Sequence, residues 1–123
     1  MKQYKRSTRL AEQLRRDLSD TWEHDYAEIT PGMLSFTRVR LTDDLRYATV
    51  YYSHLGTAEQ REQAQELLDR EAGAVRKKVG KGMRVRRIPE FNFKFDPSIE
   101  EGIRIEQLLN QIKTTDETKS SSE

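Results

Sequence analysis

The sequence predicts one α+β domain in which helices cover one face of a three-stranded sheet. Apolar residues recur every four positions between residues 10 and 22, as in an amphipathic helix. Apolar and polar residues alternate in 34–53 and again in 91–95, which is typical of strands with one buried face. With 123 residues, the chain is long enough for one core of two packed layers.

The first helix is predicted to begin near Ser7, a favourable N-cap residue. Its buried stripe should be formed by leucines and a tryptophan, and packing in the core is a sufficient explanation for them. These residues are Leu10, Leu14, Leu18 and Trp22. The helix should end before the Thr-Pro-Gly sequence at 30–32, which is a turn signal.

A β-hairpin follows, with its turn at Asp43–Asp44. In the first strand, apolar residues occupy even positions up to Phe36 and odd positions from Val39 onward. A one-residue slip in a two-residue period indicates a β-bulge, which we place near Thr37–Arg38. The second strand, 47–53, has partly apolar residues on both faces, so we expect it to be central or partly covered.

The next helical region opens with a capping box, Thr57 as N-cap and Gln60 reaching back to it. Gly73 interrupts the helical pattern, and glycine within a helix costs about 1 kcal/mol relative to alanine. We therefore predict two helices joined by a bend at Ala72 and Gly73. Gly80 and Gly82 should end the second of them.

The third strand is predicted within 88–95, with three phenylalanines on one face. A second capping box at 98–101 should open a C-terminal helix that reaches residue 113. Residues 114–123 are polar and aperiodic, so we expect a disordered tail. The predicted organisation is one domain, 1–113, followed by the tail.

The composition limits the class of protein. Hydrophobic residues make up 34% of the chain and charged residues 35%, so the core is lean and the surface highly charged. The absence of cysteine excludes disulfides and thiol chemistry and is consistent with a reducing cytoplasm. No apolar run approaches the roughly 20 residues of a membrane span. We expect a cytoplasmic protein with no membrane partner.

Charge is segregated along the chain although the formal net charge is only +1. Residues 1–16 hold six basic residues and one acid, whereas residues 17–33 hold five acids and no lysine or arginine. Residues 74–88 hold seven basic residues and no acid. A basic stretch of this kind is either a solvated helix face or a surface for a polyanion, and the absence of mixed signs favours the polyanion.

The sequence predicts no enzyme and no cofactor. His24 lies at a helix end, where capping or surface exposure explains it, and His54 is most simply a loop residue after a strand. No metal-binding histidine pair is present. The Gly-Lys-Gly sequence at 80–82 lacks the spacing of a phosphate-binding loop. A small-molecule substrate is therefore not expected.

The chain resembles the ribosome-binding factor A family, small bacterial assembly factors of the small ribosomal subunit. The resemblance covers about residues 9–109 and depends on the order of several segments. These are RLAEQLRRDLSD, FTRVRLTDDLRYATVYYS, AGAVRKKVGKGMRVRRIPEFNFKFD and SIEEGIRIEQLL. The run RVRRIPEFNFKFD with the following SIEEGIRI makes the match specific.

The resemblance implies a type II KH-like fold, αββααβ, in which a kinked Ala-x-Gly junction replaces the usual G-x-x-G loop. Here the junction is Glu71-Ala72-Gly73, where Glu71 stands in place of the usual alanine. The sequence 30–32 also differs from the family's usual Asp-Pro-Arg turn.

The resemblance further implies binding to the small ribosomal subunit or its precursor rRNA, and late maturation of that rRNA, including 5′-end processing, with a role in the cold. We expect a monomer, and release by a maturation GTPase is a property of the family. The residues expected to contact RNA are Lys5, Arg6, Arg9, Arg16, Arg76, Lys77, Lys81, Arg84, Arg86 and Arg87. The alternative is a protein-docking module that uses its acidic segment, Asp17–Glu28, without direct RNA contact.

Overall fold

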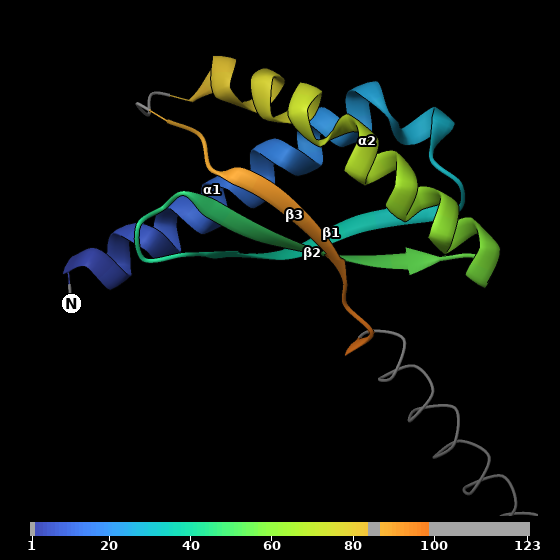
Figure 1. Ribbon diagram of the computed structural model, residues 1–123, viewed down its shortest axis with the longest axis horizontal. Coiled ribbons are helices and arrows are strands. Elements are labelled where there is room, and N and C mark those ends of the chain that lie inside the picture. The colour runs from blue at the N-terminus through green and yellow to red at the C-terminus, as the bar shows by residue number, and fades with distance from the viewer. Residues whose placement is uncertain (1, 84–86, 99–123) are drawn as a thin grey trace, which may run out of the picture.

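The computed structural model describes residues 2–83 and 87–98, which form two helices on a three-stranded sheet (Figure 1). The predicted C-terminal helix and tail lie outside these residues, as do Arg84 and Arg86. The strands form a single layer, and the helices cover it. In chain order, the elements are α1 (Lys2–Asp25), the short 3₁₀ helix η1 (Ala27–Ile29), β1 (Met33–Leu41), β2 (Tyr47–Leu55), α2 (Ala58–Gly82) and β3 (Glu90–Phe95).

The sheet has the order β1-β2-β3, which confirms that the second strand is central. β1 and β2 form the predicted antiparallel hairpin, whereas β3 joins β2 in parallel after the chain has crossed over through α2. Both helices lie on the same face of the sheet in Figure 1. The opposite face of the sheet carries no described element.

The predicted bulge is confirmed at Thr37. Phe36 pairs with Tyr52 and Arg38 with Tyr51, so Thr37 is the additional residue in β1. Its hydroxyl donates to Asp96 Oδ2 over 3.3 Å, which links the bulge to the end of β3. The bulge lets β1 keep apolar side chains toward the helices on both sides of the slip.

The core fills the space between the helices and the sheet. α1 contributes Leu14, Leu18 and Trp22, as its four-residue period predicts. The Trp22 ring stacks on Tyr26 with a centroid distance of 4.4 Å and meets the edge of Phe36 at 6.0 Å. The remaining buried hydrophobic members from α2 and the sheet are Val50, Tyr52, Leu67, Leu68, Val75, Val79 and Phe93.

The predicted start of α1 at Ser7 is wrong, because the helix already begins at Lys2. Serine is only modestly less favourable than alanine inside a helix, so Ser7 does not have to interrupt it. The capping box of α2 is confirmed. The Gln60 N–H donates to the Thr57 hydroxyl, and the Thr57 N–H donates to the Gln60 side chain.

The prediction of two separate helices is also wrong, whereas the bend at Ala72 and Gly73 stays a prediction. α2 is one continuous helix from Ala58 to Gly82 (Figure 1). Leu68 before the glycine and Val75 after it are both fully buried, and their packing holds the helix through Gly73. The cost of glycine within a helix, about 1 kcal/mol, is smaller than the free energy gained by burying two such side chains.

His54 is a buried residue of β2 and not a loop residue as predicted. Its Nε2 donates to the carbonyl oxygen of Pro31 over 2.7 Å. Gly32 beside it has φ +73°, and a Cβ there would lie 2.5 Å from His54 Nε2 and 2.6 Å from Leu55 O. The turn at 30–32 therefore closes against the end of β2 only because residue 32 has no side chain.

Candidate nucleic-acid interface

The C-terminal half of α2 presents lysines on the side opposite its buried valines. Lys77 and Lys81 are exposed, four residues apart and on one face of the helix, whereas Val75 and Val79 are buried. Among the described residues, neither lysine forms a hydrogen bond or an ion pair. Both charges are therefore available to an anion from solution.

Two other basic residues of α2 are used within the fold. Arg76 Nε and Nη2 donate to the carbonyl oxygen of Ile88 over 3.0 and 2.6 Å. Arg76 thus ties the helix to the chain entering β3, and its proposed contact with RNA stays a prediction. Lys78 Nζ lies 2.9 Å from Asp25 Oδ2 and 4.8 Å from the centre of the Tyr26 ring. Neither partner could be predicted from the sequence, because Ile88 and Asp25 lie 12 and 53 residues away along the chain.

The pKa values of Lys78 and of Asp25 are both shifted where Lys78 contacts α1. The pKa of Asp25 is lowered by hydrogen bonds from the side chain of His24 and then from Lys78. The pKa of Lys78 is raised mainly by its hydrogen bond to Asp25. Both shifts favour the charged pair, so one acid of the predicted acidic segment is already neutralised inside the molecule.

The first half of α1 holds the second basic group. Arg6 and Arg9 are exposed, and neither forms an ion pair with a described residue. Arg16 is exposed as well, but its Nε lies 3.6 Å from Glu12 Oε1. Lys5 belongs to α1, and its side chain lies outside the described part.

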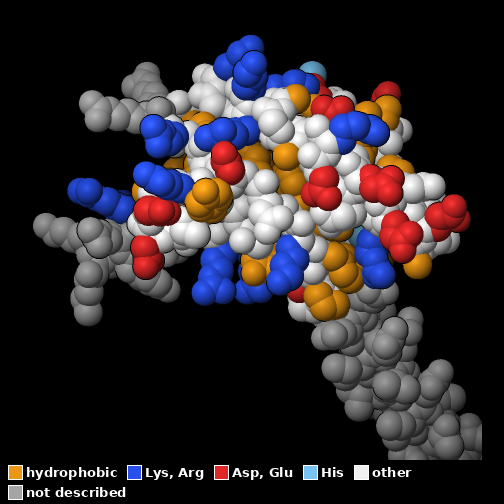
Figure 2. Space-filling view, in the orientation of Figure 1, with side chains coloured by type: hydrophobic (Ala, Val, Ile, Leu, Met, Phe, Trp, Pro, Cys, Tyr) orange, Lys and Arg blue, Asp and Glu red, His pale blue; other side chains and the backbone are white. Residues whose placement is uncertain are grey.

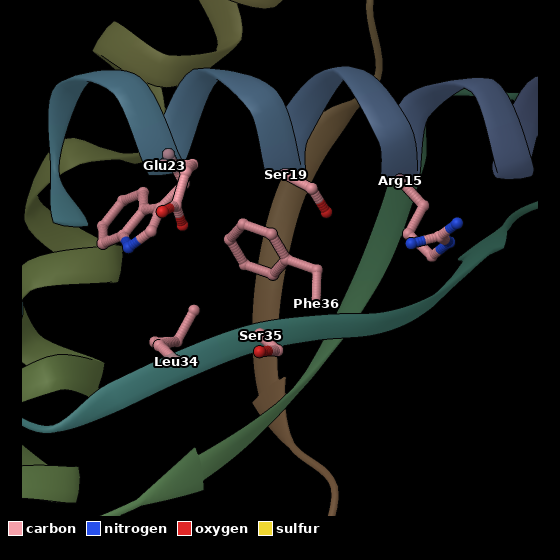
Figure 3. Close-up of a pocket in the computed structure, with 7 residues that line it drawn as sticks. Arg15, Ser19, Glu23, Leu34, Ser35 and Phe36 are labelled. Carbon is pink, nitrogen blue, oxygen red and sulfur yellow. The ribbon is translucent and has the colours of Figure 1, made fainter.

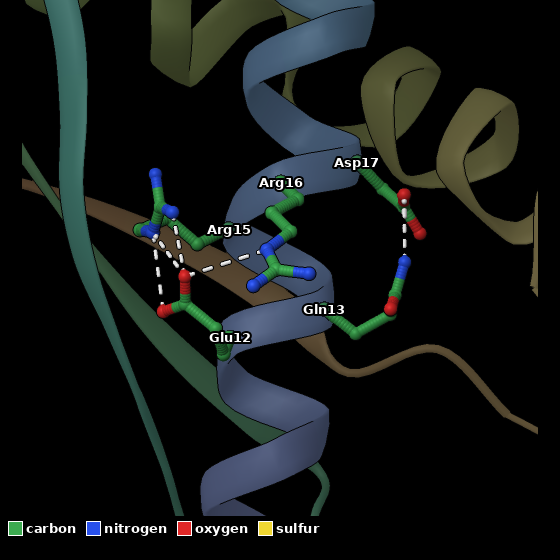
Figure 4. A network of polar contacts seen from close by, with 5 residues as sticks. All are labelled: Glu12, Gln13, Arg15, Arg16 and Asp17. Atoms are coloured by element: carbon green, nitrogen blue, oxygen red, sulfur yellow. Dashed lines mark hydrogen bonds and ion pairs between the residues drawn. The ribbon is translucent and has the colours of Figure 1, made fainter.

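Glu12 forms ion pairs with both Arg15 and Arg16 (Figure 4). Glu12 lies three and four residues before them, which places all three side chains on neighbouring positions of the helix surface. Arg15 donates to Glu12 Oε1 over 2.6 Å through Nη2, and its Nε donates to the same carboxylate. The Arg15 hydrogen bond lowers the pKa of Glu12. Arg16 is consequently a weaker candidate for phosphate binding than Arg6 or Arg9.

The two basic groups lie at one end of the molecule. Figure 1 places the start of α1 and the end of α2 at that end, and Figure 2 shows lysine and arginine side chains predominating there. Acidic side chains predominate at the other end, where α2 begins with Glu59, Glu62 and Glu66. Helix-dipole complementarity explains Glu59 in the first turn and Lys81 in the last, but it does not extend to Lys77.

Arg87 is exposed just before β3 and lines a shallow pocket with Arg46, Tyr47 and Glu90.

A second depression, of about 220 Å³, lies between α1 and β1 (Figure 3). Arg15, Ser19 and Glu23 border it from α1, and Leu34, Ser35 and Phe36 border it from β1. It is smaller than the roughly 300–1,000 Å³ of ordinary ligand pockets.

No group of acidic residues and histidines within 2–83 and 87–98 is arranged to hold a metal ion. Neither described helix is long and apolar enough to cross a membrane. The strongest feature of this part of the chain is therefore a charged surface rather than an enclosed site.

Comparison with known proteins identifies the family. The family model for ribosome-binding factor A matches residues 6–109. The chain belongs to the ribosome-binding factor A family. It is 41% identical over 112 residues to ribosome-binding factor A of Desulfitobacterium hafniense, with 91% of this chain and 90% of that protein covered. It is 40% identical over 117 residues to the ribosome-binding factor A of Thermodesulfovibrio yellowstonii, with 95% and 98% covered.

Solved structures related to ribosome-binding factor A share the fold. A Thermotoga maritima protein assigned to ribosome-binding factor A superposes with a TM-score of 0.62 and 32% identity, covering 72% of this chain and 85% of that one. Ribosome-binding factor A of Thermus thermophilus superposes with a TM-score of 0.61 and 24% identity, covering 72% of this chain and 93% of that one. A model of the Thermus protein, fitted into a cryo-EM map of its complex with the 30S subunit, gives 0.63 and 23%, covering 74% and 96%.

Proposed function

We propose that this protein binds the small ribosomal subunit or its precursor rRNA and promotes late maturation of that rRNA, including 5′-end processing. Membership of the ribosome-binding factor A family supports the proposal, as does the 30S complex of a Thermus protein of similar fold. The observation that carries it is the pair Lys77 and Lys81, two exposed positive charges without an acidic partner among the described residues. They belong to the last turns of α2, which ends in Figure 1 at the end of the molecule where Figure 2 shows lysine and arginine side chains predominating.

The mechanism we propose is electrostatic recognition of folded RNA. Lysine and arginine side chains bind phosphates and position the protein, but they do not read bases. Specificity then comes from the shape of the RNA assembled with ribosomal proteins. If about five phosphates are neutralised, the logarithm of the binding constant should fall with the logarithm of the salt concentration at a slope of about −3.5 to −4.5.

The expected RNA contacts beyond the lysine pair complete the proposed surface. Arg6, Arg9 and Arg87 are exposed and support it, whereas Arg16 and Arg76 already have partners within the fold. Lys5, Arg84 and Arg86 stay part of the proposal from the sequence. We further propose that 1–113 acts as a KH-like RNA-binding domain in a cytoplasmic monomer, with a maturation GTPase as a further partner and a role in the cold. The RNA would be cut by other enzymes.

A matched pair of charge reversals on α2 tests the proposed surface. Lys81→Glu places a negative charge at the basic end, whereas Arg70→Glu makes the same change on an exposed residue about three turns nearer the start of the same helix, away from that end. Co-sedimentation with purified small subunits should weaken by about tenfold for Lys81→Glu, and further with Lys77→Glu added, but little for Arg70→Glu. Equal losses for Lys81→Glu and Arg70→Glu would contradict the assignment of this surface.

The alternative of a protein-docking module receives less support from the acidic segment. Asp25 pairs with Lys78, and Asp17 accepts a hydrogen bond from Gln13 over 3.1 Å, so part of this segment acts within the fold. Nuclease treatment and high salt distinguish the two functions. Both should abolish association through RNA, whereas docking to a protein should survive the nuclease.

A further inference from the structure

The open face of the sheet carries a second set of basic and aromatic residues. Side chains alternate between the two faces of a strand, so those beside the buried positions point away from the helices. Below the strands, Figure 2 shows lysine and arginine side chains along the underside of the molecule. The polar and aromatic residues on this face are Ser35, Arg38, Arg40, Tyr47, Thr49, Tyr51, Ser53, Glu90, Asn92 and Lys94.

A row of three residues crosses the middle of this face. The strand register places Arg38 beside Tyr51 and Tyr51 beside Lys94. The Arg38 guanidinium lies over the Tyr51 ring, 4.1 Å from its centre. This contact holds a cationic plane and an aromatic ring in the centre of the exposed sheet, where a planar ligand can stack on them.

The bulge at Thr37 creates this row. Without the additional residue, the alternation of β1 would turn Arg38 toward the core and Val39 toward solvent. The hydrogen bond from Thr37 to Asp96 holds the bulge in place. The pKa of Asp96 is lowered mainly by hydrogen bonds from Ser98, and to a smaller extent by Thr37 and by the charge of Arg38. The positions of Arg38 and Arg40 therefore follow from a feature of the backbone.

The neighbouring row adds charge and hydrogen-bonding groups. Arg40 lies beside Thr49 and Thr49 beside Asn92. Within the described part of the chain, Arg40 and Lys94 form no ion pair or hydrogen bond. Tyr47, the first residue of β2, is 53% exposed next to Arg46 and Arg87.

Acidic groups border this face but do not neutralise it. Glu90 is the one acid on the open side of the three described strands, against three cations there, Arg38, Arg40 and Lys94. Asp96 lies at the end of β3, and Asp44 in the hairpin turn lies 4.0 Å from Arg46. The face therefore keeps a positive charge around its aromatic centre.

We propose that the open face of the sheet binds single-stranded RNA, separately from the surface at the ends of α1 and α2. A base stacks on the Tyr51 ring or on the Arg38 plane above it, and Arg40 and Lys94 bind the flanking phosphates. Thr49 and Asn92 supply hydrogen bonds to base edges or to ribose. An acidic protein segment matches the charge alone, whereas RNA matches the charge and the aromatic row together.

This site deepens the proposed function but does not depend on the contacts made by α2. The helices and the open face lie on opposite sides of the sheet (Figure 1). A protein that holds folded RNA with one side and an unpaired strand with the other would keep two rRNA segments apart until they pair.

Fluorescence anisotropy with the full chain and a labelled, unstructured RNA of about 12 nucleotides tests the inference. Tyr51→Leu removes the stacking ring and should weaken binding by at least about fivefold, whereas Tyr51→Phe keeps the ring and should bind within about twofold of the wild type. Arg40→Gln should weaken binding and reduce the magnitude of the salt slope by about one. Arg70→Gln removes one charge from α2 and serves as the control.

The outcomes separate this inference from the proposed function. Wild-type affinity in both Tyr51→Leu and Arg40→Gln, with their melting temperatures retained, would overturn the inference and leave the face to a protein partner. Equal weakening by Arg40→Gln and Arg70→Gln would overturn it as well, since charge alone would then be responsible. If Tyr51→Leu loses oligonucleotide binding while Lys81→Glu binds the oligonucleotide like the wild type, the inference is supported, whatever the result of co-sedimentation.

Discussion

Lys78 Nζ lies 2.9 Å from Asp25 Oδ2 and joins the middle of the second half of α2 to the last residue of α1. Lys78 also lies over Tyr26, whose hydroxyl donates to Glu71 over 3.4 Å. This contact divides the basic residues in the C-terminal half of α2 into two kinds. Lys78 and Arg76 hold the fold together, while Lys77 and Lys81 extend into solvent.

The ion pair predicts a pH dependence of stability. The pKa of Asp25 is lowered in the folded state, so its contribution is complete above the unfolded pKa and is lost as the pH falls through the folded value. The pKa of Lys78 is raised, so its contribution is lost only as the pH rises through its folded value. The melting temperatures of the wild type and Asp25→Asn should differ at neutral pH and converge on acidification. A constant difference down to about pH 3 would contradict this.

Gly73→Ala should stabilise the protein by about 0.5–1 kcal/mol. The residue lies inside continuous α2, its φ is not positive, and a Cβ there would meet nothing within 4 Å. Alanine lowers the entropy of the unfolded chain and has the higher helix propensity. Urea denaturation measures the change. A loss of stability would show that the helix needs glycine at this point, as a kinked junction would.

Gly32→Ala should destabilise the protein by at least about 2 kcal/mol. Its φ of +73° is unfavourable for alanine, and the added Cβ would collide with His54 and with the backbone of Leu55. The same denaturation experiment measures this change, with Gly73→Ala as the matched control. A denaturation midpoint equal to that of the wild type would contradict this prediction, because it would mean that the turn accommodates a Cβ without loss of stability.

Phe93→Ala should cost about 3–5 kcal/mol of unfolding free energy. Phe93 is 4% exposed and packs against Phe36 and Phe91 at centroid distances of 5.8 and 6.2 Å. Asn92→Ala, the exposed neighbour on the same strand, should cost far less and serves as the control. If the two variants unfold at the same denaturant concentration, the core does not extend to β3 as described.

Much of the fold could be predicted because it depends on local patterns. The four-residue period of α1, the capping box at Thr57 and the slip at Thr37 each follow from the order of neighbouring residues. The errors arose where distant contacts decide. Burial of Leu68 and Val75 overrides the helix-weakening effect of Gly73, and a carbonyl group 23 residues away holds His54 in the sheet.

The candidate site was predicted less completely. The sequence identified the basic segment and included Lys77 and Lys81 among the residues expected to contact RNA, and both are exposed on one face of α2. It assigned the same role to Arg76, whose partner is the carbonyl oxygen of Ile88. It also passed over Arg38, Arg40 and Lys94, which are separated along the chain and meet only when three strands pair.

By itself, the sequence determined the kinds of element, their order, the bulge and the amount of positive charge, since each depends on residues close together in the chain. Which of these charges are free depends on the folded chain, because an ion pair or a hydrogen bond needs a partner brought near by folding. Lys78 and Lys81 look alike in the sequence, yet one is held by Asp25 of another helix and the other faces solvent.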